Sequence, residues 1–91
     1  MTRAEILDAA KQCVCGDRDE QYGSPEQSFE AIADLWTSYL KTKGIAKTWI
    51  SPADAAAMMA LFKIARIATG QAKADNWIDL AGYAACGGEL S

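Results

Sequence analysis

The chain has 91 residues, of which 51% are hydrophobic and 23% charged, a composition typical of a globular domain and unlike that of a disordered chain. Its formal net charge is −3, and its basic residues are spread along the sequence, which argues against nucleic acid as a partner. The N-terminus leads directly into an amphipathic pattern, without an apolar signal segment or a run of about 18 apolar residues, so we expect neither secretion nor a membrane partner.

Size and cysteine content point to one small cytoplasmic domain, which we place at residues 1–91. The cysteines Cys13, Cys15 and Cys86 are odd in number and do not form a disulfide framework, which suits a reducing cytoplasm. Structural zinc is disfavoured because the chain has no histidine and the C-x-C spacing is unusual for zinc. A core this small would have difficulty covering three tryptophans, so we expect a homo-oligomer.

Three segments carry the pattern of a helix start, in which a hydroxyl residue is followed three positions later by a side chain that can close a capping box. These segments are 2–5, 24–27 and 51–54. In the last two a proline occupies the first helical position, where its missing N–H has no cost. The predicted helices are 3–14, 25–42, 52–69 and about 74–86. The predicted fold class is therefore all-α, a compact bundle of four helices.

Glycines follow or end each of these segments, and we expect them to close the helices in the left-handed conformation. They are Gly16, Gly44, Gly70 and the pair Gly87-Gly88. The helix at 25–42 has one apolar stripe, whereas the helix at 52–69 is apolar nearly all the way round. The second pattern predicts that 52–69 is the central, buried helix.

The polar connection 16–23 is the first candidate for a functional segment. It contains Arg18, Gln21 and Tyr22 between two well-defined helices, and charged connections of this kind often carry binding residues. The alternative is a solvated loop in which Tyr22 packs against the bundle.

Acidic residues form the second candidate. Asp75 and Asp79 are four residues apart, so their carboxylates project from one helical face about one turn apart, and Glu26 and Glu30 repeat that spacing. Carboxylate pairs on two helices are an arrangement that holds Mg²⁺, which can then bridge to phosphate oxygens. Alternatively, Asp75 caps its own helix and Glu26 is favoured by the helix dipole.

The third candidate is the pair Lys63 and Arg66, the cations of the otherwise apolar part of 52–69. At a spacing of three residues they emerge together, either to reach solvent, to bind phosphate or to pair with acidic helices. Asp54 lies on the opposite side of the helix from Lys63, and we expect it to close its own capping box. Without histidine a Ser-His or Cys-His dyad is excluded, which leaves metal-assisted attack by water as the mechanism of any enzyme.

Three longer motifs run along the chain. They are Arg18-x-x-Gln21-Tyr22-Gly23-x-Pro25-Glu26-x-x-Phe29-x-x-Ile32-Ala33-x-Leu35-Trp36, Asp54-x-Ala56-x-Met58-Met59-x-Leu61-x-Lys63-Ile64-Ala65-Arg66, and Asp75-x-Trp77-x-Asp79-x-Ala81-Gly82-Tyr83-Ala84-Ala85. Together they resemble a family of small phage-encoded domains of unknown function. The last motif also looks like the final helix of the MazG-like all-α nucleotide pyrophosphohydrolases, although its acidic pair is spaced by four residues rather than three.

The resemblance implies a phage-encoded, nucleotide-handling protein of MazG-like outline in the host cytoplasm, with a nucleotide or other phosphate-bearing small molecule as its partner. Glu26, Asp75 and Asp79 would then be the catalytic residues and would hold Mg²⁺, as in a pyrophosphohydrolase. Substrate phosphates would be bound by Lys63, Arg66 and the connection residues named above. The alternative is a non-catalytic protein that counters host defence, either by sequestering a nucleotide signal or by binding a host protein.

Overall fold

The computed structural model describes residues 1–16, 25–70 and 73–91, except for the side chains of 25–27, and it confirms the all-α class. Its helices are α1 (Arg3–Cys15), α3 (Pro25–Thr42), α4 (Pro52–Thr69) and α5 (Ala74–Leu90). No strand occurs in these ranges. Within them, no helix is long and apolar enough to cross a membrane. The predicted bounds are confirmed except that α1 ends one residue later and α5 continues four residues further.

Two of the three predicted capping boxes lie in the described part of the chain, and both are formed. The backbone N–H of Glu5 donates to the hydroxyl of Thr2 at 3.1 Å, and the N–H of Thr2 donates to the Glu5 carboxylate at 2.9 Å. Ser51 and Asp54 make the same reciprocal pair at 3.0 Å in each direction. Asp54 therefore closes its own helix start, as predicted.

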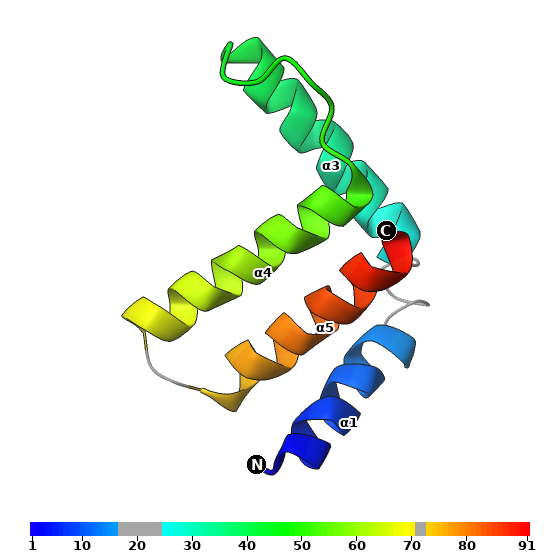
Figure 1. Cartoon of the computed structure of the whole chain (residues 1–91), viewed down its shortest axis with the longest axis vertical. Helices are drawn as coiled ribbons and strands as arrows, with labels where there is room; N and C mark the ends of the chain where they lie inside the picture. Colours follow the sequence, from blue (N-terminus) through cyan, green and yellow to red (C-terminus); the bar gives the residue numbers. More distant parts are fainter. Residues whose placement is uncertain (17–24, 71–72) are drawn as a thin grey trace.

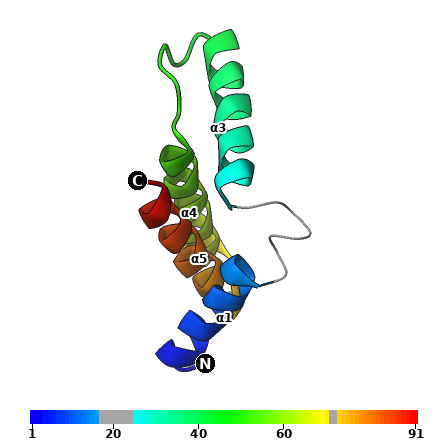
Figure 2. The same ribbon diagram turned by 90° about the vertical axis from the view of Figure 1, so that its right-hand side faces the viewer.

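The helices α1, α5 and α4 lie side by side, with α5 in the middle, and α3 crosses the end of this layer (Figure 1). Figure 2 shows the layer from its side, with α3 rising beyond it. The prediction that the helix at 52–69 is central is therefore wrong. It lies at the edge of the layer, because α5 offers small residues on two sides and α4 uses only one of its apolar sides for packing.

The core lies where α3 meets the start of α4 and the end of α5. Its buried residues are Phe29, Ala33, Ala55, Ala56 and Cys86. The ring of Phe29 meets Tyr83 edge to face, with centroids 6.0 Å apart and planes at 82°, a geometry that aromatic pairs favour. This cluster fixes α3 against the layer.

Glycines within α5 allow its neighbours to approach closely. A Cβ at Gly87 would lie 3.3 Å from the Cβ of Ala56 on α4, and one at Gly82 would lie 3.2 Å from Val14 on α1. The prediction that Gly87-Gly88 ends the last helix is wrong, because α5 runs to Leu90. The absence of a side chain serves packing there rather than helix termination.

The predicted left-handed glycines are confirmed only at Gly44, which has φ 74°. Gly16 and Gly70 have φ −93° and −114°, so the prediction is wrong for both. Between α3 and α4 the chain is held by Thr37, a fully buried residue whose hydroxyl accepts from the N–H of Ile50 at 2.8 Å. That bond ties the connection to the packed side of α3.

Candidate functional site

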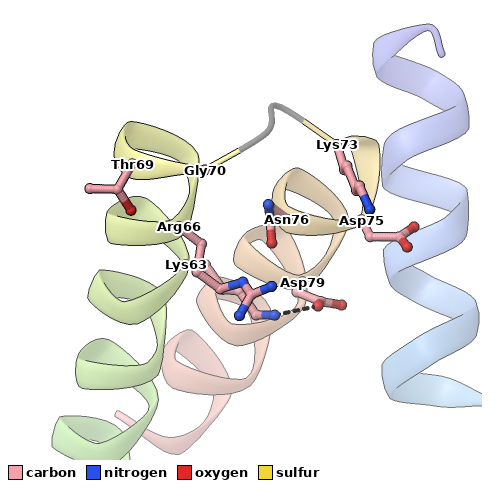
Figure 3. Close-up of a pocket in the computed structure, with 8 residues that line it drawn as sticks. All are labelled: Lys63, Arg66, Thr69, Gly70, Lys73, Asp75, Asn76 and Asp79. Atoms are coloured by element: carbon pink, nitrogen blue, oxygen red, sulfur yellow. Dashed lines mark ion pairs between the residues drawn. The ribbon is translucent and has the colours of Figure 1, made fainter.

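A pocket of about 640 Å³ lies where α4 ends and α5 begins, and it collects most of the charge predicted to be functional (Figure 3). Its lining residues are Lys63, Arg66, Thr69, Gly70, Lys73, Asp75, Asn76 and Asp79. The cations come from the last turns of α4 and the residue before α5, and the carboxylates come from the first turns of α5. The set carries three positive and two negative charges at neutral pH.

The helical periods explain why these side chains gather. Lys63 and Arg66 are three residues apart on α4, and Asp75 and Asp79 are four apart on α5, so each pair shares one side of its helix. The connection between the helices is short, and the two charged sides therefore meet. Figure 3 shows both carboxylates on one side of α5, with Asp79 turned toward Lys63.

Lys63 and Asp79 form an ion pair, with 2.8 Å between Nζ and Oδ2 and side chains that are 15% and 35% exposed. Of the alternatives that the sequence left open for the α4 cations, Lys63 thus takes the pairing with an acidic helix. Arg66 is exposed and makes no ion pair among the described residues, so its guanidinium remains available at the pocket wall. Both cations also lie over the ring of Phe62, at 5.7 and 5.8 Å from its centroid.

The start of α5 adds a local positive potential. Its N-cap residue is Lys73, which makes no side-chain capping bond, so the first-turn N–H groups lack the side-chain acceptor that Thr2 and Ser51 supply elsewhere. The N–H of Asn76 donates to the carbonyl of Lys73 at 3.1 Å, and the attraction for an anion comes from the positive end of the helix dipole. Asp75 occupies this first turn, where a carboxylate is favourable.

Two of the three predicted magnesium ligands have described side chains. Asp75 and Asp79 both line the pocket, but the described residues contain no group of three or more Cys, Asp or Glu that could hold a metal ion. The side chain of Glu26 lies outside the described set. The start of α3, where Glu26 stands, lies beside the far end of α5 (Figure 1).

The start of α3 and the two aspartates lie at opposite ends of α5. Phe29, one turn after Glu26, belongs to the same buried cluster as Cys86. Cys86 is about 16 Å along the helix axis from Asp75. The three-carboxylate metal site therefore stays a prediction that depends on Glu26.

Other predicted site residues lie outside the described part of the chain, namely Arg18, Gln21 and Tyr22. In the other direction, the pocket contains residues that the sequence analysis did not single out. They are Thr69, Gly70, Lys73 and Asn76. Asn76 is only 8% exposed. The sequence signal for it is a polar residue four positions before Leu80 and seven before Tyr83, on an apolar side of the predicted helix.

Comparison with known proteins assigns the family. The family described as a domain of unknown function (DUF6378) matches residues 5–91. The chain belongs to the DUF6378 family. This agrees with the predicted resemblance to small phage-encoded domains, because the similar proteins also come from phages.

Two relatives carry the name Gene 55 protein. That of Mycobacterium phage D29 is 38% identical over 81 residues, which cover 89% of this DUF6378 chain and 50% of the relative. That of Mycobacterium phage L5 is 39% identical over 79 residues, or 87% of this chain and 47% of the relative. The chain thus spans about half the length of these relatives.

No solved structure matches the chain significantly. The matches support the phage relationship and the unknown function, but they do not support the resemblance to MazG-like enzymes. Any activity must therefore be argued from the pocket itself.

Proposed function

We propose that this protein binds a phosphate-bearing small molecule, of the nucleotide class, in the pocket between α4 and α5. The observation that carries the proposal is the gathering of three cations, Lys63, Arg66 and Lys73, around one hollow beside an uncapped helix start. Phosphate groups are recognised by this combination of guanidinium, ammonium and backbone N–H donors. A pocket of about 640 Å³ has the volume of a small-molecule site.

Each cation has a distinct part in the proposed binding. Arg66 is exposed, and its planar guanidinium can donate two parallel hydrogen bonds to phosphate oxygens. Lys73 stands directly before α5, so its charge adds to that of the helix start. Lys63 already neutralises Asp79 at 2.8 Å, which keeps that carboxylate from repelling an anion.

Mg²⁺ fits this proposal as an ion that arrives with the phosphates. Asp75 and Asp79 offer oxygen ligands one turn apart, but Asp79 is engaged with Lys63, and a cage of three described carboxylates is absent. Mg²⁺ commonly takes one or two carboxylates and completes its shell with phosphate oxygens and water. Bound in this way, the ion would neutralise phosphate charge next to Asp75.

A bound nucleotide could have one of two fates: hydrolysis with release of pyrophosphate, or sequestration without turnover. Both require binding in the pocket, and they differ only in whether pyrophosphate is released. The chain supplies no histidine, so turnover would depend on a metal-activated water. Binding is therefore the property to measure first.

The test is calorimetric titration of nucleoside triphosphates and diphosphates, with and without Mg²⁺, into the native protein and three variants. Arg66→Gln and Lys73→Gln each remove a pocket cation. Lys47→Gln removes an exposed lysine in the connection between α3 and α4, and it is the matched control. Loss of a charge-assisted hydrogen bond contributes roughly 1.5–3 kcal/mol, so each pocket variant should bind roughly 10- to 100-fold more weakly.

The control should bind like the native protein, and raising the salt concentration should weaken every complex. Equal losses in all three variants, or no binding of any nucleotide, would contradict the proposal. Release of pyrophosphate that Asp79→Asn abolishes would favour the hydrolase, and binding without release would favour sequestration. If nothing binds, the large apolar side chains exposed on several helices favour the remaining alternative, a protein partner.

A further inference from the structure

Asn76 is the buried residue of the pocket between α4 and α5. It is 8% exposed, whereas the other lining residues that the structure describes are exposed or half-buried. Its side chain extends from the first turn of α5 into the space between the two helices (Figure 3). The amide therefore lies deeper in the pocket than the charged groups around it.

The side-chain amide of Asn76 is unused within the described part of the chain. The backbone N–H of Asn76 donates to the carbonyl of Lys73, but its side chain has no hydrogen-bond partner among the described residues. Its polar atoms are not sealed off, because every fully covered side-chain polar atom in the described ranges has a partner. Buried amides are nearly always hydrogen-bonded, and an unpaired one costs stability. An unused amide deep in an open pocket is thus a group that a ligand can satisfy.

The two polar atoms of this amide restrict the ligand group that suits it. Nδ2 of Asn76 donates hydrogen bonds and Oδ1 accepts them. Ionised phosphate oxygens only accept, so a phosphate would pair with Nδ2 and leave Oδ1 without a donor. A hydroxyl both donates and accepts, and two neighbouring hydroxyls can therefore pair with both atoms of the amide. A ribonucleotide carries such a pair on its sugar.

The base is a poorer match for this pocket than the sugar. Proteins commonly hold bases by stacking them on aromatic side chains, and the described lining contains neither an aromatic ring nor a large apolar side chain. The nearby ring of Phe62 does not line the pocket, and Lys63 and Arg66 already lie over it at 5.7 and 5.8 Å from its centroid. The lining therefore favours a ligand whose base stays outside.

We propose that Asn76 binds the ribose hydroxyls of the nucleotide, so that the pocket selects its ligand by sugar and phosphates and not by base. This inference rests on the proposed function, because it takes a nucleotide to be the ligand, and it names the part of that nucleotide which Asn76 contacts. The exposed cations Arg66 and Lys73 then hold the phosphates.

The test is calorimetric titration of ATP, UTP and 2′,3′-dideoxy-ATP into the native protein and into Asn76→Leu, which keeps a branched side chain without hydrogen-bonding groups. A neutral hydrogen bond contributes roughly two- to tenfold in affinity. The native chain should therefore bind the dideoxy nucleotide roughly 5- to 100-fold more weakly than ATP, and should bind ATP and UTP equally within about threefold. Asn76→Leu should bind ATP as weakly as the native chain binds the dideoxy nucleotide.

The matched control is Gln12→Leu, which removes an exposed amide on α1 and should keep the full preference for the ribose hydroxyls. Urea denaturation without nucleotide distinguishes binding from a structural role. Asn76→Leu should unfold at the native midpoint or above it, because its amide makes no hydrogen bond in the described fold. A structural amide would instead lower that midpoint.

The comparison of ATP with 2′,3′-dideoxy-ATP on the native chain needs no variant, so it decides the proposal even if Asn76→Leu folds poorly. Equal affinities for these two nucleotides would overturn the ribose contact and leave the phosphate pocket standing. A loss in Asn76→Leu that appears only with Mg²⁺ would also overturn it, because Oδ1 would then serve the metal. If no nucleotide binds the native chain, the proposed function fails and this inference fails with it.

Discussion

The two sides of α4 differ in a way that reverses the usual arrangement of large and small apolar residues. Toward the rest of the molecule, Ala55 and Ala56 are 0% exposed, and Ala56 meets Gly87 so closely that a Cβ there would lie at 3.3 Å. Away from it, Leu61 and Phe62 are 64% and 49% exposed. Small residues set the distance between the helices inside the chain, and the large ones remain on the outside.

This difference teaches where stability and association come from in so small a domain. Alanine burial removes little apolar area from water. The close contact of α4 and α5 therefore fixes the distance between the two helices but adds little to the free energy of unfolding. The large buried aromatic is Phe29, at the corner where α3 meets the layer. The large apolar residues on the other side of α4 are left exposed by the described part of the chain.

The largest effect should come from removing phenylalanine on the packed side. Phe29→Ala should lower the free energy of unfolding by roughly 3–5 kcal/mol, because the side chain is 6% exposed and its cavity cannot collapse fully. Phe62→Ala is the matched control on the exposed side of α4, where the ring is 49% exposed, and it should cost less than about 1 kcal/mol. Urea denaturation at low protein concentration measures both, and similar losses would remove the distinction between the two sides.

Enlarging alanine at adjacent positions should separate the two sides again, with a smaller effect. Ala56→Leu adds volume against Gly87 and should destabilise the fold by about 1–3 kcal/mol. Ala57→Leu adds the same volume at an exposed position, so the midpoint of denaturation should change little. If both variants unfold at the same urea concentration, the tight α4–α5 contact is wrong.

A polar contact on the packed side gives the next effect. Thr37→Val keeps the shape of a fully buried side chain but leaves the N–H of Ile50 without its acceptor, which should cost about 1–2 kcal/mol. Thr42→Val, at the exposed end of α3, should be neutral. Hydrogen exchange at the Ile50 amide is the direct measurement, and unchanged protection in Thr37→Val would contradict the assignment.

The smallest effect should lie outside both sides of α4, at the start of α1. Hydrogen bonds from the backbone and hydroxyl of Thr2 lower the pKa of Glu5 below its ordinary value of 4.5. The carboxylate is thus stabilised in the folded chain, so its contribution is present above that ordinary value and is lost as the pH falls through the lowered pKa.

Glu5→Gln isolates this contribution. The variant should melt slightly below the native chain at about pH 7, and the difference should shrink toward about pH 3. Thermal melts followed by circular dichroism measure it. A difference that grows in acid would have the wrong sign for a lowered pKa.

The candidate site was predictable in its charges but not in its full lining. Helical spacing puts Lys63 and Arg66 on one side of α4, and Asp75 and Asp79 on one side of α5, so each pair followed from the sequence. That the two pairs line one pocket did not follow from spacing. Lys73 joins them only because the start of α5 lies beside the end of α4. Whether Glu26 lies near Asp75 and Asp79 could not be predicted in this way. Its spacing from Glu30 does not determine which end of α5 the start of α3 approaches.

By itself the sequence determined where the helices lie, because hydroxyl caps, first-turn prolines and apolar periods act within a few residues of one another. Only the tertiary structure decided that α5 is central, that Gly87 serves close packing and that α4 lies at the edge. Those properties depend on which of several apolar faces meet. A helix that is apolar nearly all round, like α4, is equally suited to burial within its own chain and to burial against another.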